Sequence, residues 1–154
     1  MQYVRVLCRN GNYRNITFQH IRRNHPKIFT SKAQISLKAT DPGLYPRLDW
    51  LLTALERICS PRELRTLEYL RLARDGLLPT LEISFAKKLP AVAEASVANA
   101  VIQFLHAYAM ACMRCGDSMH RWPQPGKVNL CRKCRDGRIT ADFVASRYKW
   151  QQPG

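Results

Sequence analysis

Hydrophobic positions between residues 41 and 111 repeat at the period of an α-helix. The first such stretch carries five apolar positions at successive spacings of three, one, three and three residues: Leu48, Leu51, Leu52, Leu55 and Ile58. This spacing predicts an amphipathic helix. A longer, alanine-rich stretch runs from about Val92 to Met110, and one of its faces collects Val97, Val101, Phe104, Leu105 and Tyr108. Small residues on its other sides indicate close packing against helices or against another chain.

A third helix is predicted after Ser60. Ser60 supplies a hydroxyl N-cap, Pro61 suits the first helical position, and Glu63 stands at the third, a combination typical of a helix start. The apolar stripe that would follow, ending at Gly76, is Leu64, Leu67, Leu70 and Ala73. Residues 84–89 show no clear period.

The first 40 residues predict short elements. Residues 2–8 alternate weakly and favour a short strand, and Asn10 to Asn12 form a turn signal. Thr17 is placed to cap a helix that runs to about Asn24 before Pro26 ends it. Ser31 and Gln34 have the capping-box spacing, which predicts a second helix to about residue 39. Two short helices joined by a turn resemble a helix-turn-helix, and two ordinary surface helices are the alternative.

Charge is distributed unevenly along the chain. The 154 residues carry 25 Lys and Arg against 11 Asp and Glu, a formal net charge of +14. Residues 1–40 hold eight basic and no acidic residues, residues 41–111 hold eight of each, and residues 112–138 hold seven basic and two acidic. The surplus therefore lies at the two ends, on either side of a neutral middle. This distribution is typical of surfaces that face a polyanion such as nucleic acid.

The four cysteines of the carboxy-terminal part form two pairs: Cys112 with Cys115, and Cys131 with Cys134. Two residues separate the members of each pair and fifteen residues separate the pairs, a spacing typical of a structural zinc site that has no open coordination position. Two disulfides or a redox-active pair are the alternatives, and His120 is a possible substitute ligand. Cys8 and Cys59 stand alone and are interpreted as small buried hydrophobic residues.

These patterns together predict a mainly α protein, a helical domain with a carboxy-terminal four-cysteine module like a zinc ribbon. Three regions are expected: a basic segment over residues 1–40 with the possible helix-turn-helix, a helical core over 41–111, and a zinc module with a basic tail over 112–154. His20, His25 and His106 fit no ligand spacing and are interpreted as surface or hydrogen-bonding residues.

The basic residues around these elements are the candidate nucleic-acid contacts, because Lys and Arg neutralise phosphates. They are Arg22, Arg23, Lys32, Lys38, Arg114, Arg121, Lys127, Arg132, Lys133 and Arg135. Trp122, between Arg121 and Lys127 in sequence, could stack on a base, dock on a protein or shield the sulfurs.

From Val101 to Arg138 the chain resembles the FlhC family of flagellar transcription activators. The resemblance consists of a helix leading into Cys112-Met113-Arg114-Cys115-Gly116, a loop with His120 and prolines, and then Cys131-Arg132-Lys133-Cys134. Related regulators occur on conjugative elements. The resemblance implies an all-helical protein whose four cysteines hold zinc, which binds promoter DNA through the basic residues around them and works with a small helical partner of the FlhD type.

The hypothesis that follows is a zinc-stabilised transcription regulator, expected to be an activator that binds duplex DNA in a heteromeric complex with a small helical subunit or RNA polymerase. The alternatives are a zinc-ribbon RNA-binding or antitermination factor, and a subunit of a CRISPR-type or conjugation nucleoprotein complex. No catalytic constellation stands out, so an enzyme is not expected. No apolar run is long enough for a membrane span, and the first residues lack a secretory pattern, so a cytoplasmic protein is expected.

Overall fold

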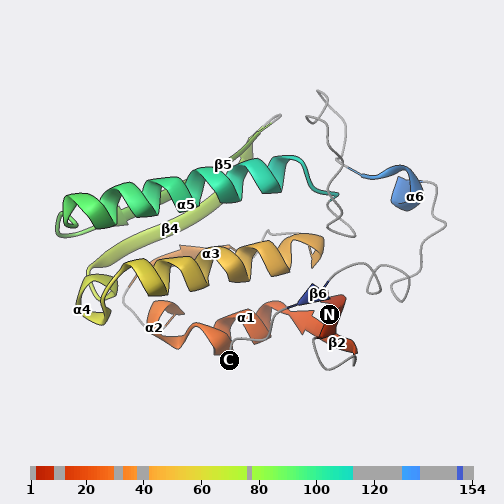
Figure 1. The fold of residues 1–154 in the computed structure, drawn as a ribbon, viewed down its shortest axis with the longest axis horizontal. Coiled ribbons are helices and arrows are strands. Elements are labelled where there is room, and N and C mark those ends of the chain that lie inside the picture. The colour runs from red at the N-terminus through yellow and green to blue at the C-terminus, as the bar shows by residue number, and fades with distance from the viewer. Residues whose placement is uncertain are drawn as a thin grey trace.

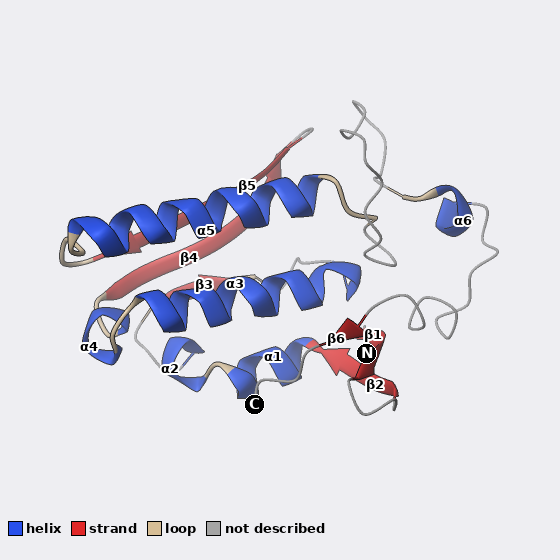
Figure 2. Ribbon diagram, in the orientation of Figure 1, coloured by secondary structure: helices blue, strands red, loops and turns tan. Residues whose placement is uncertain are grey.

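The computed structural model describes residues 3–8, 13–29, 33–37, 42–75, 78–112, 130–135 and 149–150. Its main body is a layer of two helices on a small sheet (Figure 1). Helices α3 (Tyr45–Ile58) and α5 (Ala91–Ala109) lie side by side and run in opposite directions. The strands lie behind them (Figure 2), so both helices cover the same face of the sheet.

The sheet behind the helices has three strands in the order β3-β4-β5. Strand β3 (Gln34–Ser36) pairs in parallel with β4 (Leu67–Asp75), and β4 pairs antiparallel with β5 (Leu78–Phe85). A second sheet has the order β2-β1-β6 and joins β1 (Tyr3–Cys8), β2 (Tyr13–Thr17) and β6 (Lys149–Trp150). The strand predicted over residues 2–8 is thus confirmed.

Helix α3 forms where the leucine spacing predicts it. A short 3-10 turn, η1 (Pro42–Leu44), precedes it, and Pro46 lies in its first turn, where a missing N–H costs nothing. The four leucines of the predicted stripe are buried, and Ile58 is partly buried against the same core. Burial of one continuous apolar face explains why this helix is stable.

Helix α5 confirms the second predicted helix within a residue at each end. Val97, Phe104 and Tyr108 are buried and Val101 and Leu105 are partly buried, so the face chosen by periodicity is the face that packs. Ala100 is also buried. Small residues on this helix permit close packing on α3 and β5, as expected.

The helix predicted from Ser60 to Gly76 is wrong beyond its first turn. Ser60 does cap a helix, α4 (Pro61–Leu64), by accepting a hydrogen bond from the backbone N–H of Glu63 at 3.2 Å. The chain then enters strand β4 at Leu67. The register of β4 against β5 shifts between Leu67 and Tyr69, and this irregularity lets Leu67 and Leu70 both face the core. Two buried leucines three residues apart have the same apolar spacing as a helix, which explains the wrong prediction.

The helix predicted near Thr17 is confirmed as α1 (Phe18–Asn24). Thr17 Oγ1 accepts the backbone N–H of His20 at 3.4 Å, and the backbone N–H of Thr17 donates to Nδ1 of His20 at 3.2 Å. This reciprocal pair is a capping box with histidine in place of the usual glutamate. The helix ends at Asn24, directly before the His25-Pro26 step, as predicted, and Pro26 begins a separate short helix, α2 (Pro26–Phe29).

The prediction of a second helix for the helix-turn-helix is wrong over the residues that the structure describes. The described residues 33–37 contain strand β3, whose backbone pairs with Tyr69, Leu70 and Arg71 of β4. The capping-box pattern is local, and the hydrogen bonds offered by β4 override it. Lys32 and Lys38, two of the candidate nucleic-acid contacts, lie outside the described residues.

The described core draws on every region of the chain. Ile21, Ile28 and Leu37 belong to the same buried cluster as the leucines of α3 and the apolar face of α5. The expectation of a mainly α fold is therefore confirmed only in part: helices are the larger elements, but two three-stranded sheets accompany them. The hydrophobic pattern failed to predict the β4–β5 hairpin, and it also missed strands β2 and β3.

Candidate metal centre

The end of α5 positions Cys112. Phe104 and Tyr108 anchor the last turns of the helix in the core, and the backbone N–H of Met110 donates to the carbonyl of His106 at 3.2 Å, closing the helix. Cys112 follows two residues later and is fully buried. Because the helix is packed along its length, the position of this thiol is fixed by the core.

A short helix brings the second pair of cysteines. Helix α6 (Arg132–Arg135) contains Cys134, and Cys131 directly precedes it. Residues three apart lie on one side of a helical turn, so both sulfurs can face the same point. Cys134 is buried and Cys131 is partly buried.

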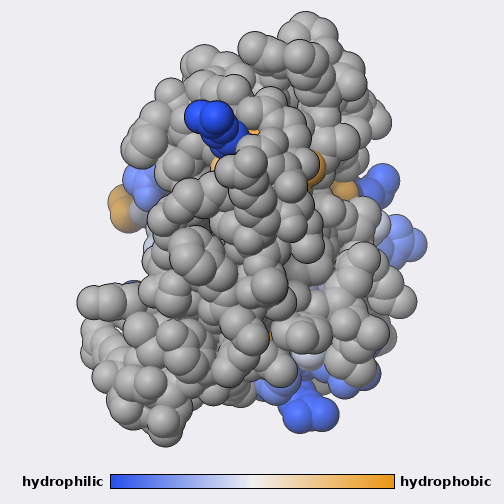
Figure 3. All heavy atoms as spheres, turned by 90° about the vertical axis from the view of Figure 1, so that its right-hand side faces the viewer, coloured by the Kyte–Doolittle hydropathy of each residue, from blue (hydrophilic) through white to orange (hydrophobic). Residues whose placement is uncertain are grey.

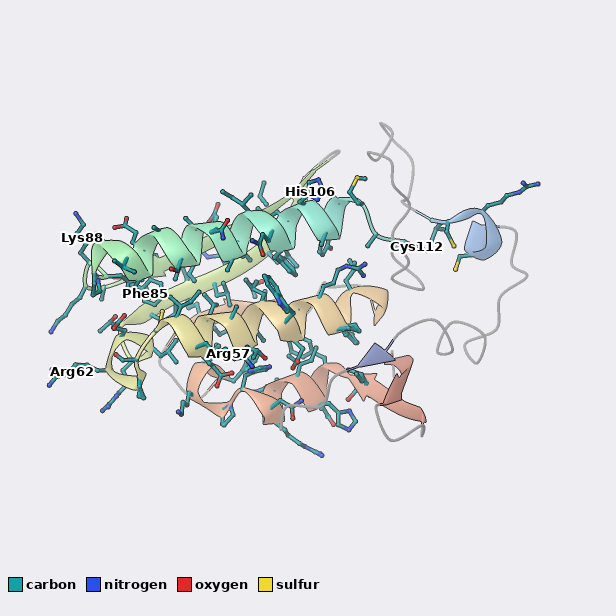
Figure 4. All side chains as sticks on the ribbon, viewed as in Figure 1. Arg57, Arg62, Phe85, Lys88, His106 and Cys112 are labelled. Carbon is teal, nitrogen blue, oxygen red and sulfur yellow. The ribbon has the colours of Figure 1, made fainter. Side chains whose placement is uncertain are left out.

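Cys112 converges with Cys131 and Cys134, which lie about twenty residues later in the sequence. The Sγ atoms of Cys112, Cys131 and Cys134 all lie within 4.8 Å of one another, and Figure 4 labels Cys112 between the end of α5 and α6. In a tetrahedral zinc–thiolate site with bonds of about 2.3 Å, the sulfurs stand about 3.8 Å apart. A contraction of at most about 1 Å would bring the three sulfurs to that spacing, so this trio can hold a metal ion.

Of the four predicted ligands, Cys115 lies outside the described residues, as does the alternative ligand His120. The three described thiols are the soft donors that zinc and other thiophilic metals prefer. All three are thiols and not disulfides, which agrees with the interpretation of the pairs as ligands.

Cys59 differs from these three. It is buried at the end of α3 and does not belong to the trio, as expected for a small hydrophobic residue. Burial, and to a smaller extent the charge of Glu63, raises the pKa of the Cys59 thiol to about 11. Such a thiol is almost entirely protonated at neutral pH and is a poor nucleophile. The side chain of Cys8, in β1, lies outside the described residues.

The structure describes the positions of some of the candidate nucleic-acid contacts. Arg22 and Arg23 are exposed on α1, and the guanidinium of Arg22 lies over the ring of Phe29, 5.8 Å from its centroid. Arg132 is exposed on α6, which lies well apart from α1 (Figure 1). On the face shown in Figure 3 most of the described hydrophilic side chains lie near the edge of the molecule, and one strongly hydrophilic group lies within the upper part of the face.

The remaining candidates fall outside the described surface. Lys133 and Arg135 belong to α6, but their side chains lie outside the described part. Five more lie outside the described residues altogether: Lys32, Lys38, Arg114, Arg121 and Lys127. Trp122 lies outside them too.

A polar cluster that the sequence did not single out lies between α1, α2 and α3. His25, at the junction of α1 and α2, donates from Nε2 to Oδ1 of Asp49 at 2.6 Å and from Nδ1 to Oε1 of Glu56. Burial alone would lower the pKa of His25, but the hydrogen bonds and charges of both carboxylates outweigh it, so this pKa is raised above 6.5. His25 was expected at the surface or in a hydrogen bond. It is hydrogen-bonded, and it is buried.

No family model, curated protein or solved structure matches the chain. The resemblance to the FlhC family therefore stays a prediction from the cysteine region. None of the helices in the described part combines the length and the apolar character that crossing a membrane requires.

Proposed function

We propose that this chain is a zinc-stabilised transcription regulator that binds nucleic acid, with duplex DNA as its main target. The observation that carries the proposal is the convergence of Cys112, Cys131 and Cys134 at the end of α5. A basic surplus accompanies it: seven Lys and Arg against two Asp and Glu over residues 112–138. A metal module set in a basic segment is a common design for binding phosphate backbones.

The proposed role of the metal is structural. With Cys115 as the fourth ligand the coordination shell is closed, so no position remains for a reacting water. Bound metal would join the end of α5 to α6 and hold the segment between them as a module. Sites of this type contribute roughly 10 kcal/mol or more to the folding of small domains. The proposal therefore treats the chain as a binding protein and not as an enzyme.

The regulatory part of the proposal rests on two observations from the sequence. The segment from Val101 to Arg138 resembles the zinc module of the FlhC family, and both ends of the chain are basic. In that family the module works beside a small helical partner, and a partner of that kind or RNA polymerase is proposed here too. A position inside the cell follows from the same proposal.

The decisive experiment joins metal analysis to binding measurements on the purified full-length chain. We expect one zinc ion per chain, and salt-dependent binding that is tighter for duplex DNA than for RNA of the same length. Absence of zinc from protein purified without chelator would contradict the metal assignment. Zinc with a clear preference for RNA would instead favour an antitermination-type factor, and binding without any preference would favour a subunit of a nucleoprotein assembly.

A further inference from the structure

A small hollow opens between α3 and α5 on the surface of the helical layer. Its volume is about 280 Å³, a little below the roughly 300–1,000 Å³ of pockets that take drug-sized ligands. It therefore fits one ring system and not a whole cofactor. The described residues that line it are Arg47, Trp50, Gln103, Phe104 and Ala107.

Trp50 is the unusual residue of this hollow. Its neighbours Leu48, Leu51 and Leu52 are buried, whereas Trp50 leaves 46% of its surface exposed. Helix α3 is otherwise a core helix with few exposed positions. A half-exposed indole beside an apolar hollow is typical of a surface that binds a partner group, because its ring is both a large apolar face and a stacking platform.

The other lining residues suit a flat polar ring. Phe104 is buried and lines the hollow from the core side, and Ala107 has a small side chain that leaves room. Gln103 is exposed, and its amide offers both a donor and an acceptor. An aromatic face combined with an amide matches a nucleobase, which has a stacking surface and hydrogen-bonding edges.

Charge around the hollow favours the same ligand. None of the described residues that line it is acidic, and Arg47 brings a guanidinium to its wall. The nearest carboxylates of α3, on Asp49 and Glu56, are bonded to His25. The acid of α5, Glu94, lines a different pocket with β5.

An exposed cation lies farther along the same row of α3. Arg57 stands two turns from Trp50, about 10 Å along the helix axis, which is within reach of the phosphates that flank a stacked base. A protein partner would be expected to neutralise this positive surface with carboxylates, whereas a nucleotide chain brings the phosphates with the base.

We propose that the hollow between α3 and α5 binds one unstacked nucleobase of single-stranded nucleic acid, with the base stacked on Trp50. The inference rests on the proposed nucleic-acid binding and adds to it a contact made by base stacking, remote in sequence from the cysteine module. Such a contact would allow the chain to hold a single strand where a duplex has opened. The hollow supplies the same chemistry for DNA and for RNA.

The test uses Trp50 as its own reporter. In the full chain with Trp122→Phe and Trp150→Phe, Trp50 is the remaining tryptophan. We expect its fluorescence to be quenched by unlabelled oligothymidylate or oligouridylate of about ten nucleotides, and to stay unchanged when a blunt duplex binds. Comparing the two oligomers shows whether DNA or RNA is preferred.

A second measurement separates stacking from charge. Trp50→Ala should weaken binding of labelled oligothymidylate by about fivefold or more, and Trp50→Phe should retain most of the affinity. The dependence of affinity on salt should not change, because every group that neutralises a phosphate is still present. Ile102→Ala, an exposed apolar residue of α5 outside the hollow, is the matched control and should bind as the parent chain does.

The outcomes distinguish the two proposals. If oligothymidylate and oligouridylate bind while Trp50 emission and the affinity of Trp50→Ala stay unchanged, the base site is wrong and nucleic-acid binding stands. The base site is equally wrong if Trp50 responds to an added protein partner and not to either oligomer. If the chain binds no nucleic acid even at low salt, both proposals fail.

Discussion

Nε2 of His25 lies 2.6 Å from Oδ1 of Asp49, and both side chains are buried. The second ring nitrogen of His25 faces Oε1 of Glu56. Both carboxylates therefore come from the same side of helix α3. An imidazole can donate from both nitrogens only as the imidazolium ion. The junction of α1 and α2 is therefore fixed to α3 by a charged, hydrogen-bonded bridge that spans 24 and 31 residues of sequence.

Removing His25 should destabilise the fold. His25→Ala leaves the carboxylate of Asp49 buried without its cation, and breaking a buried ion pair from one side costs about 3 kcal/mol or more. We expect a decrease of that size in the free energy of unfolding measured with urea. Gln19→Ala, at an exposed position of α1, is the control and should change it by less than about 0.5 kcal/mol. A decrease no larger than the control's would show that the bridge contributes little.

Stability should also fall as the pH rises above neutrality. Because the folded protein raises the pKa of His25 above 6.5, its protonated form stabilises the fold. The contribution is complete below pH 6.5 and disappears as the pH passes the raised pKa. Urea unfolding from about pH 6 to about pH 9 should show this decline, and His25→Gln should remove it. An identical pH profile in both proteins would assign the decline to other groups.

The cysteine trio should be required for metal binding. Cys131→Ser replaces a thiolate by a hydroxyl, a much poorer ligand for zinc, so we expect the variant to release its zinc. Cys59→Ala should keep zinc at the parent's stoichiometry, because Cys59 is buried and lies outside the trio. A colorimetric zinc assay on both purified variants measures the difference. Full zinc in Cys131→Ser would remove that residue from the site.

Basic residues of α6 should bind phosphates of the duplex. Replacing Arg132, Lys133 and Arg135 by Ala should leave zinc in place but weaken duplex binding and reduce the salt slope by about 0.9 for each phosphate that is no longer neutralised. The control is Arg62→Ala in α4 together with Arg65→Ala, the residue that directly follows α4. Arg62 projects from the end of the molecule opposite Cys112 (Figure 4). An unchanged affinity in the α6 variant would assign phosphate binding to the amino-terminal residues Arg22 and Arg23.

Part of the candidate site could be predicted and part could not. The sequence predicted that Cys112, Cys131 and Cys134 bind the same metal ion. Two residues between a pair of thiols let both sulfurs reach one ion, and this holds whatever the rest of the fold. The exposure of Trp50 could not be predicted from the sequence. Trp50 lies within the leucine-rich stretch of α3, and its surroundings depend on how α5 packs. His25 gave no signal, since its two partners are distant in sequence.

The sequence by itself determined the elements whose stability is local. Helices α3 and α5 follow from apolar residues at a period near 3.6, and the starts of α1 and α4 follow from the caps at Thr17 and Ser60. Each of these signals lies within a few turns of the hydrogen bonds it predicts, so no distant partner was needed to interpret it.

Only the tertiary structure decided where strands replace helices. Residues 34–36 pair with β4 more than 30 positions away, and β4 pairs with β5 through an irregular register. The spacing of Leu64, Leu67 and Leu70 suits a helix and equally suits a turn followed by a bulged strand. Whether these residues form a helix or a strand is decided by backbone hydrogen bonds between segments distant in sequence. Those partners come together only once the chain has folded.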